Sequence, residues 1–166
     1  MKRIFFYILP IVAALLSLAA CSDDDYDSVP PTFSAMTFEN LSGASDDLRV
    51  GDRIVATAVQ RKKGERLYGS SYSWSVEPAE GVATQRAYGG GVYDDDPRNP
   101  SDTIVFASAG SYKITLTAEY KPSGARGLES GYTETLESGG TATYNVLGSG
   151  LFYYTATVTG YVRVGN

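Results

Sequence analysis

The chain has 166 residues, of which 14 are lysine or arginine and 19 are aspartate or glutamate, giving a formal net charge of −5. It has no histidine, which excludes histidine-based nucleophilic catalysis and removes the commonest zinc ligand. It has one cysteine, Cys21, so no disulfide can form within the chain. An acidic chain also lacks the positive surface that phosphate backbones require, so we expect no nucleic-acid partner. We likewise expect neither an enzyme nor a bound cofactor.

Residues 1–20 have the pattern of a secretory signal peptide. Lys2 and Arg3 form a short positive segment, residues 4–20 are almost continuously apolar, and the run ends in small residues. The run is short for a helix that crosses a hydrocarbon core of ~30 Å, and Pro10 interrupts it, which disfavours the alternative of an uncleaved anchor. Removal of the leader takes two of the 14 basic residues and no acidic one, so 12 basic and 19 acidic residues remain and the formal charge becomes −7.

The residues at the end of the leader, Leu18-Ala19-Ala20-Cys21, resemble the lipobox of bacterial lipoproteins. The resemblance implies that the Cys21 thiol receives a diacylglycerol, that the leader is cut just before Cys21, and that the new amino group is acylated. Two or more acyl chains hold a protein stably on a membrane, whereas one chain gives only marginal binding. The resemblance therefore predicts a membrane partner, reached through a lipid anchor.

An acidic cluster directly follows the cysteine and consists of Ser22, Asp23, Asp24 and Asp25. It is similar to the surface-export signal of Bacteroidota-type outer-membrane lipoproteins, which implies a lipid-anchored protein exposed on the cell surface. The alternative is a solvated tether, because runs of like charge are usually extended. Residues 21–31 end in Val29-Pro30-Pro31 and are interpreted as a linker.

Residues 32–166 show short alternating apolar and polar runs separated by Gly, Pro, Asp and Ser, which is typical of an antiparallel β-sandwich or barrel. The predicted strands are residues 33–38, 53–59, 71–76, 102–107, 111–120 and 152–164. The residues predicted to face the core are Ile54, Ala56, Ala58, Tyr72, Trp74, Val76, Ile104, Phe106, Tyr112, Ile114, Leu116, Ala118, Phe152, Tyr154, Ala156, Val158, Val162 and Val164. Trp74, the only tryptophan, is predicted at the centre of this core.

Three segments of this domain resemble the polycystic-kidney-disease (PKD) domain, an immunoglobulin-like module: Gly51-Asp52, Tyr72-Ser73-Trp74-Ser75-Val76, and residues 106–116. The resemblance implies an all-β, immunoglobulin-like antiparallel β-sandwich of about seven strands, an extracellular setting and no catalytic residues. The sequence departs from the family after Trp74, where Ser75-Val76-Glu77-Pro78 replaces the usual Asp-Phe-Gly-Asp-Gly type of turn.

Two segments are long for loops in a small sandwich, residues 80–101 and 121–150. In the second, residues 132–136 and 141–146 alternate on either side of Ser138-Gly139-Gly140, which predicts a β-hairpin. Oxygen-bearing residues that could ligate calcium lie in residues 80–101 or directly after them, namely Asp94, Asp95, Asp96, Asn99 and Asp102. Their spacing differs from that of an EF-hand loop, and a solvated loop is the alternative.

Exposed tyrosines suggest a second kind of site, because an aromatic ring can stack on the apolar face of a sugar. Tyr88 and Tyr93 flank a glycine-rich turn, and Tyr153 and Tyr161 lie on the predicted outer face of the last strand. The alternative is that these rings cover the sheet or pack under the long loops.

Three classes of function fit these observations. The first is a non-enzymatic outer-membrane surface lipoprotein whose sandwich is a binding or spacer module, accessory to a larger envelope complex. The second is a glycan-binding lipoprotein of a polysaccharide-uptake system. The third is a structural or adhesive subunit that assembles through a strand edge, for which residues 152–164 are the candidate.

Overall fold

A computed structural model describes residues 28–43, 47–88, 99–122, 130–148 and 153–166 of the chain. Several predicted site residues lie outside the described residues, namely Cys21, Ser22, Asp23, Asp24, Asp25, Tyr93, Asp94, Asp95 and Asp96. The predicted core residue Phe152 lies outside them too. Within the described ranges, no helix has the length and apolar character needed to cross a membrane.

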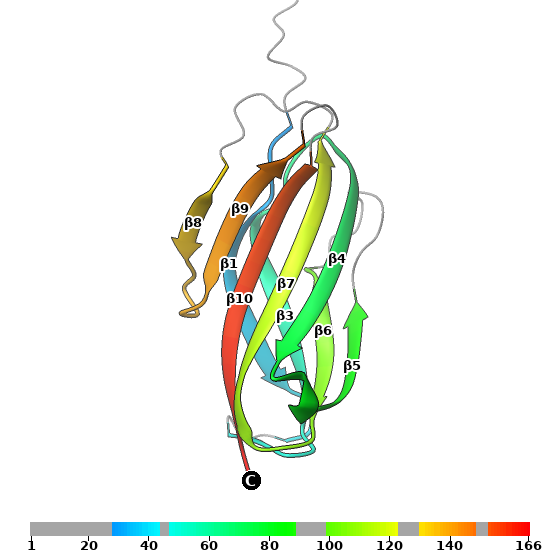
Figure 1. The fold of residues 1–166 in the computed structure, drawn as a ribbon, viewed down its shortest axis with the longest axis vertical. Helices are drawn as coiled ribbons and strands as arrows, with labels where there is room; N and C mark the ends of the chain where they lie inside the picture. The colour runs from blue at the N-terminus through cyan, green and yellow to red at the C-terminus, as the bar shows by residue number, and fades with distance from the viewer. Residues whose placement is uncertain (1–27, 44–46, 89–98, 123–129, 149–152) are drawn as a thin grey trace, which may run out of the picture.

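The described chain is an all-β sandwich of two sheets (Figure 1). One sheet has the order β1-β3-β6-β5, formed by β1 (Thr32–Asn40), β3 (Arg53–Lys62), β6 (Ser101–Phe106) and β5 (Val82–Tyr88). The other has the order β4-β7-β10-β9-β8, formed by β4 (Leu67–Glu77), β7 (Gly110–Pro122), β10 (Tyr153–Gly165), β9 (Thr141–Leu147) and β8 (Tyr132–Thr135). These neighbours are antiparallel, and the two-residue β2 (Leu48–Arg49) pairs in parallel with the end of β10. The sandwich prediction is confirmed.

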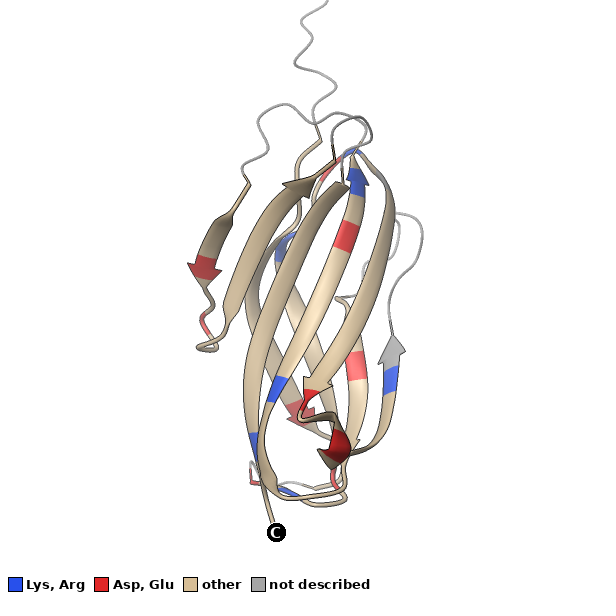
Figure 2. Ribbon diagram, in the orientation of Figure 1, with Lys and Arg blue, Asp and Glu red and all other residues tan. Residues whose placement is uncertain are grey.

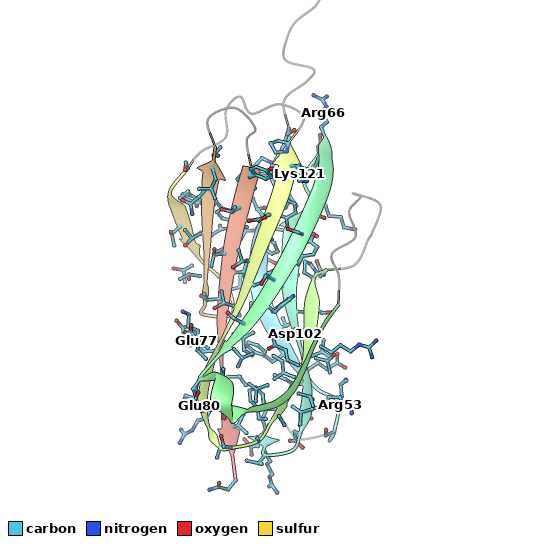
Figure 3. The ribbon with its side chains drawn as sticks, turned by 45° about the vertical axis from the view of Figure 1, so that its right-hand side comes forward. Arg53, Arg66, Glu77, Glu80, Asp102 and Lys121 are labelled. Atoms are coloured by element: carbon cyan, nitrogen blue, oxygen red, sulfur yellow. The ribbon has the colours of Figure 1, made fainter. Side chains whose placement is uncertain are left out.

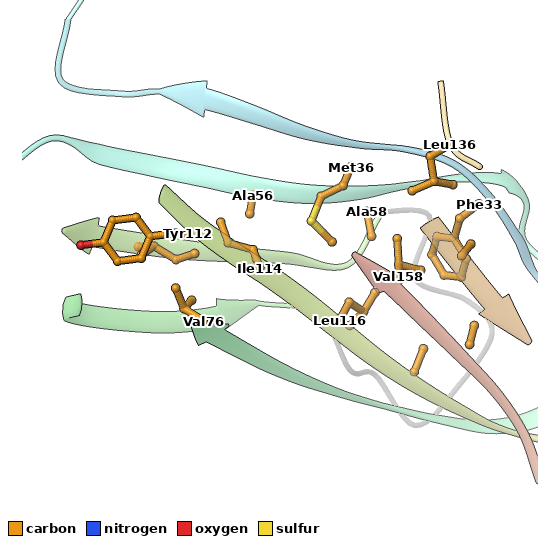
Figure 4. Close-up of a cluster of buried hydrophobic side chains, with 14 of the residues drawn as sticks. Phe33, Met36, Ala56, Ala58, Val76, Tyr112, Ile114, Leu116, Leu136 and Val158 are labelled. Atoms are coloured by element: carbon orange, nitrogen blue, oxygen red, sulfur yellow. The ribbon is translucent and has the colours of Figure 1, made fainter. Parts of the chain in front are cut away.

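The core lies between the sheets and follows the predicted alternation (Figure 4). Ile54, Ala56 and Ala58 of β3 face Ile114, Leu116 and Ala118 of β7, and all six are fully buried. This alternation arises because successive side chains of a strand point to opposite faces of its sheet.

The prediction for Trp74 is wrong, because its side chain is only partly buried at the margin of the core. It belongs to β4, one of the two outermost strands of its sheet. An inward-facing side chain on an outermost strand lies at the rim of the sandwich, so only part of it can be covered. The largest fully buried side chains come from other strands and include Tyr112, Tyr120, Phe33 and Phe106.

The corner between β6 and β7 is fixed by Tyr112. Its hydroxyl donates to the carbonyl oxygen of Ser108 at 2.7 Å, and its ring lies 4.4 Å from that of Phe106, centroid to centroid. Gly81, the last residue of the short 3-10 turn η2 (Ala79–Gly81), makes room for this hydroxyl, since a Cβ there would lie 2.1 Å from it. The corner therefore depends on a tyrosine and a glycine 31 residues apart.

Residues 80–101 are not a simple loop, because they contain β5, which pairs with β6. The sequence pattern did not predict this strand. Residues 83–86 are all exposed, and the register shifts between Val82 and Thr84. An outermost strand with a bulge and no continuous buried face lacks the alternation by which strands are recognised.

The predicted hairpin is confirmed as β8 and β9. The expectation that the last strand forms an edge of its sheet is wrong, because this hairpin pairs with it. β10 pairs with β7 from Tyr154 to Val164 and with β9 from Tyr153 to Thr159. It therefore lies inside the six-stranded sheet, and the outermost strands there are β4 and β8. Because β10 has a neighbouring strand along each of its two edges, the side chains of β7 and β9 flank its outward-facing residues. This explains why the outward-facing Thr155 and Thr159 are only 7% and 8% exposed.

The hairpin also covers the outer edge of β1 in the opposite sheet. The Phe33 N–H donates to the Tyr144 hydroxyl at 2.9 Å, and the Met36 N–H donates to Ser138 Oγ at 3.0 Å. The Tyr144 hydroxyl in turn donates to Glu134 Oε1 at 2.7 Å, and Arg61 reaches Glu134 Oε2 at 3.1 Å. These bonds join the two sheets along one side of the sandwich.

Candidate functional site

A hollow with a volume of about 500 Å³ lies at one end of the outer face of the six-stranded sheet. It is lined by Gly69, Ser70, Ser71, Glu119, Lys121, Leu147 and Tyr153. This volume falls within the range of small-molecule sites. The start of β4, the end of β7, the end of β9 and the start of β10 meet here because these strands are paired antiparallel in that order.

The register of the sheet explains which side chains share the hollow. Tyr153 is opposite Leu147, and Ser71 is opposite Glu119. Gly69 is opposite Lys121 and has no side chain, so it leaves space at the floor. One wall is therefore apolar, formed by a half-buried tyrosine ring and a leucine that is 51% exposed. The other wall carries a carboxylate, an ammonium group and a hydroxyl.

Two rows of hydroxyl side chains cross the sheet beside the hollow. One row is formed by Ser73, Thr117, Thr157, Thr143 and Thr133, and the other by Ser75, Thr115, Thr159, Thr141 and Thr135. Some of these hydroxyls bond to one another, as Thr141 and Thr159 do at 2.8 Å and Thr133 and Thr143 do at 2.9 Å. Figure 2 shows that charged residues on β4, β7 and β10 lie toward the strand ends and leave these rows uncharged. The face next to the hollow is thus polar but neutral.

The four predicted tyrosines do not form one site. Tyr153 lines the hollow, whereas Tyr161 is 63% exposed and lies eight residues along β10, about 26 Å away at the usual strand rise. Tyr88 ends β5 in the other sheet, and Tyr93 is outside the described residues. Of the two tyrosines whose side chains the structure describes, Tyr153 and not Tyr161 lines the hollow. The other lining residues were not predicted, because their proximity arises from pairing between strands distant in the sequence.

The two described residues of the calcium hypothesis are already engaged by protein groups. Asn99 Oδ1 accepts a hydrogen bond from the Gln60 N–H at 2.9 Å. Asp102 is fully buried on the core-facing side of β6 with Ile104 and Phe106, and its carboxylate accepts a hydrogen bond from Gln85. Among the described residues, no three acidic or cysteine side chains gather as a metal site would require. The remaining three aspartates of that hypothesis lie outside the described residues.

The burial of Asp102 predicts a pH dependence of stability. Burial raises the pKa of this carboxyl above its ordinary value of 3.8, and the hydrogen bond from Gln85 opposes the rise only in part. Between the ordinary and the raised pKa, the folded chain binds a proton that the unfolded chain does not. The contribution of Asp102 to stability is therefore fully present below pH 3.8 and is lost as the pH rises through the raised pKa.

Asp102→Asn removes this titration while keeping the size and the hydrogen-bond acceptor of the side chain. We expect the variant to gain stability relative to the original chain as the pH rises from about 4 to about 7. Urea unfolding at several pH values measures the difference in the free energy of unfolding between the two proteins. A constant difference over this range would contradict a raised pKa at Asp102.

Comparisons of the chain with known protein families, with curated proteins and with solved structures return no match. The hollow beside Tyr153 is therefore assigned on its geometry and its chemistry.

Proposed function

We propose that this chain is a non-enzymatic lipoprotein of the bacterial outer membrane, exposed on the cell surface and accessory to a larger envelope complex. Its binding site is the hollow beside Tyr153, and its ligand is a glycan. The observation that carries the ligand proposal is the pairing of an accessible tyrosine–leucine wall with a carboxylate, an ammonium group and a serine hydroxyl in one hollow of about 500 Å³.

Two features support an immunoglobulin-like, PKD-like identity for the sandwich. The strand order β1-β3-β6-β5 against β4-β7-β10 corresponds to the A-B-E-D and C-F-G sheets of that fold. Tyr112, near the start of the strand that corresponds to F, bonds back to the Ser108 carbonyl, as the tyrosine corner of immunoglobulin-like domains does. In this interpretation β8 and β9 are a hairpin inserted between the last two strands.

A glycan suits the hollow because sugar rings present both apolar faces and hydroxyl groups. The Tyr153 ring and the Leu147 side chain can pack on the apolar face of a sugar. Glu119 accepts hydrogen bonds from hydroxyls, and Lys121 donates to them. The neutral hydroxyl rows next to the hollow offer further hydrogen-bonding groups to a longer chain.

The hollow lies at the end of the domain where the chain enters from its N-terminus. Val29 pairs with Glu65, just before β4 begins at Leu67. Seven residue steps separate Cys21 from Ser28, so a lipid on Cys21 lies within roughly 25 Å of chain from the sandwich. In the proposed arrangement the hollow faces the space close to the membrane, and the opposite end of the domain points away from it.

The lipid anchor is tested by Cys21→Ala. We expect the original chain to fractionate with outer membranes and the variant to be lost from them, because the variant has no thiol to acylate. Protease added to intact cells should digest the anchored protein, as followed by immunoblot. Protection until the outer membrane is opened would contradict surface exposure without contradicting the anchor, whereas membrane retention of Cys21→Ala would contradict the anchor.

The glycan site is tested by Tyr153→Ala on a glycan array, followed by titration calorimetry with the glycans that bind. We expect at least a tenfold loss of affinity, corresponding to about 1.4 kcal/mol, because the stacking wall of the hollow is removed. Tyr161→Ala is the matched control, since it removes an exposed tyrosine from the far end of the same strand and should leave affinity unchanged. Equal binding by both variants would contradict this site, as would an array without binding.

A further inference from the structure

Five tyrosine rings form a continuous line across the inner face of the six-stranded sheet. Each strand of the path β4-β7-β10-β9-β8 contributes one ring. In this order the residues are Tyr72, Tyr120, Tyr154, Tyr144 and Tyr132. The centroids of successive rings lie 6.0, 6.2, 6.0 and 6.0 Å apart. This tyrosine ladder therefore leads from one outermost strand of the sheet to the other, with each ring beside the next.

The tyrosine ladder is buried in its middle and accessible at its two ends. The three central rings belong to the core and are at most 3% exposed. At one end, Tyr72 is partly buried and lies two positions from Trp74 on the same face of β4, about 7 Å away at the usual strand rise. At the other end, Tyr132 is 49% exposed. A reagent in solution therefore acts on the central rings only by way of the ends.

A line of tyrosines in near contact can conduct an electron. Tyrosine and tryptophan are the aromatic side chains that lose one electron most readily, whereas phenylalanine loses one far less readily. The rate of electron transfer between two rings falls steeply with their separation, so neighbouring rings exchange an electron faster than distant ones. A phenol that has lost an electron is a strong acid, and a base within hydrogen-bond reach can take its proton. The position of such a base therefore decides where the oxidised state settles.

Tyr144 is the ring of the ladder that has such a base. Its hydroxyl donates to Glu134 Oε1 at 2.7 Å, and Arg61 holds Glu134 Oε2 at 3.1 Å. Among the described residues, no other hydroxyl of the ladder donates to a carboxylate. Burial raises the pKa of Tyr120 and the pKa of Tyr154, so these two hydroxyls keep their protons. The oxidised state is therefore most stable at Tyr144.

Three other carboxylates on the strands and turns near the ladder are placed differently. Figure 3 shows Lys121 toward one end of the domain and Glu77 with Glu80 toward the other. Tyr120 directly precedes Lys121, so the ladder lies nearer to the Lys121 end. Glu119 precedes Tyr120 but points to the outer face of the sheet, because successive side chains of a strand alternate. None of these three carboxylates is placed to serve the ladder as a base.

We propose that the tyrosine ladder carries a one-electron oxidation from Trp74 to Tyr144 and on to Tyr132, which is a site of covalent oxidation. A radical oxidant at the surface takes one electron from the Trp74 indole and becomes an anion. Each ring then refills the one before it, until Tyr144 has lost an electron and its phenolic proton has moved to Glu134. Tyr132 next gives an electron to Tyr144, which recovers its proton from Glu134, while the phenolic proton of Tyr132 passes to water.

The radical on Tyr132 is open to solvent and to a second copy of the chain. Two Tyr132 radicals join through one new carbon–carbon bond between their rings, a step that consumes both radicals and needs no further oxidant. Each chain has then lost one electron and one proton, and one oxidant has been reduced for each chain. The ladder thus directs oxidation away from the core and the single tryptophan to an exposed ring. This role depends on neither the lipid anchor nor the glycan site.

The end point of the oxidation is tested on the full chain carrying Cys21→Ala, which removes the only thiol. Azidyl radicals generated by irradiation are the oxidant, and they oxidise indole in preference to phenol, so the reaction starts at Trp74. We expect covalent dimers joined mainly at Tyr132 when their peptides are mapped by mass spectrometry. Tyr161 should form fewer links although it is more exposed, at 63%. Links mainly at Tyr161, or no tyrosine links, would overturn the proposal.

The route is tested by Tyr154→Phe in the same background. The substitution interrupts the ladder in its middle, keeps the ring and removes no hydrogen bond found among the described residues. Tyr161→Phe is the matched control, because it makes the same change on the same strand outside the ladder. Cross-linking at Tyr132 should fall in Tyr154→Phe to the level of Tyr161 in the starting protein and stay unchanged in Tyr161→Phe. Equal cross-linking at Tyr132 in both variants would overturn the ladder as the route.

Glu134→Gln tests the base without changing a ring, and Glu137→Gln, at an exposed position of the same hairpin, is its matched control. After a pulse of azidyl radicals, the absorbance of the tryptophan radical should decay as that of the tyrosine radical rises, at a rate independent of protein concentration. Glu134→Gln should slow this conversion, because an amide does not accept the phenolic proton, and Glu137→Gln should not. Equal rates in the two variants, or a rate that rises with concentration, would overturn transfer to Tyr144 within the chain.

Discussion

Gly140→Ala is expected to lower the free energy of unfolding by about 3 kcal/mol. A Cβ at this position would lie 1.8 Å from the carbonyl oxygen of Thr159. That oxygen belongs to the backbone of β10, which is paired on both sides and cannot shift without disturbing its neighbours. The hairpin would have to move away from β10 and from the edge of β1. Urea unfolding followed by tryptophan fluorescence measures the loss.

The matched control is Gly110→Ala, whose Cβ would meet its nearest neighbouring atom, on the Tyr112 ring, at 3.7 Å. This is an ordinary van der Waals contact, so we expect a change within about 0.5 kcal/mol. If the two variants unfold at the same urea concentration, the close approach of Gly140 to β10 is not what holds the hairpin in place.

Tyr144→Phe is expected to lower the free energy of unfolding by about 1–3 kcal/mol. The substitution leaves the ring in place but removes the hydroxyl that accepts from the Phe33 N–H and donates to Glu134. The Phe33 N–H is then buried without its partner, and the link from β9 to β1 is lost. Burial, together with the hydrogen bond to Glu134, raises the pKa of Tyr144 above its ordinary value, so the hydroxyl remains a donor at physiological pH.

Tyr132→Phe is the control for this substitution, because Tyr132 is the neighbouring ring in the same stack, 6.0 Å away, and is 49% exposed. Water can occupy the place of the removed hydroxyl at this exposed side chain. We therefore expect the free energy of unfolding to change by no more than about 0.5 kcal/mol. Hydrogen exchange of the Phe33 amide adds a local readout and should become faster in Tyr144→Phe only. Unchanged exchange in that variant would contradict the role of the hydroxyl in covering the edge of β1.

These two sites show why the hairpin matters to the proposed function. It gives β10 its second neighbour, it covers the edge of β1, and its Leu147 forms part of the hollow. The proposed binding site therefore depends on where the hairpin docks.

The candidate site was only partly predictable. Tyr153 was singled out because it lies on the outer face of an alternating strand, and the structure places it in the hollow. The sequence does not single out Glu119 and Leu147, because no local pattern distinguishes them from other outward-facing residues. They reach Tyr153 through strand pairing across segments distant in the chain, and β10 joins two of those segments.

The sequence by itself determined the β-strands with a regular alternation, most of the residues they bury and the hairpin of residues 132–146. Burial of one face imposes a period of two on each strand, and that signal is local. Only the tertiary structure decided which strands are outermost, and this placed Trp74 at the rim, β10 inside its sheet and β5 in a segment without alternation. The neighbours of a strand depend on how distant segments pack and pair, which no local period records.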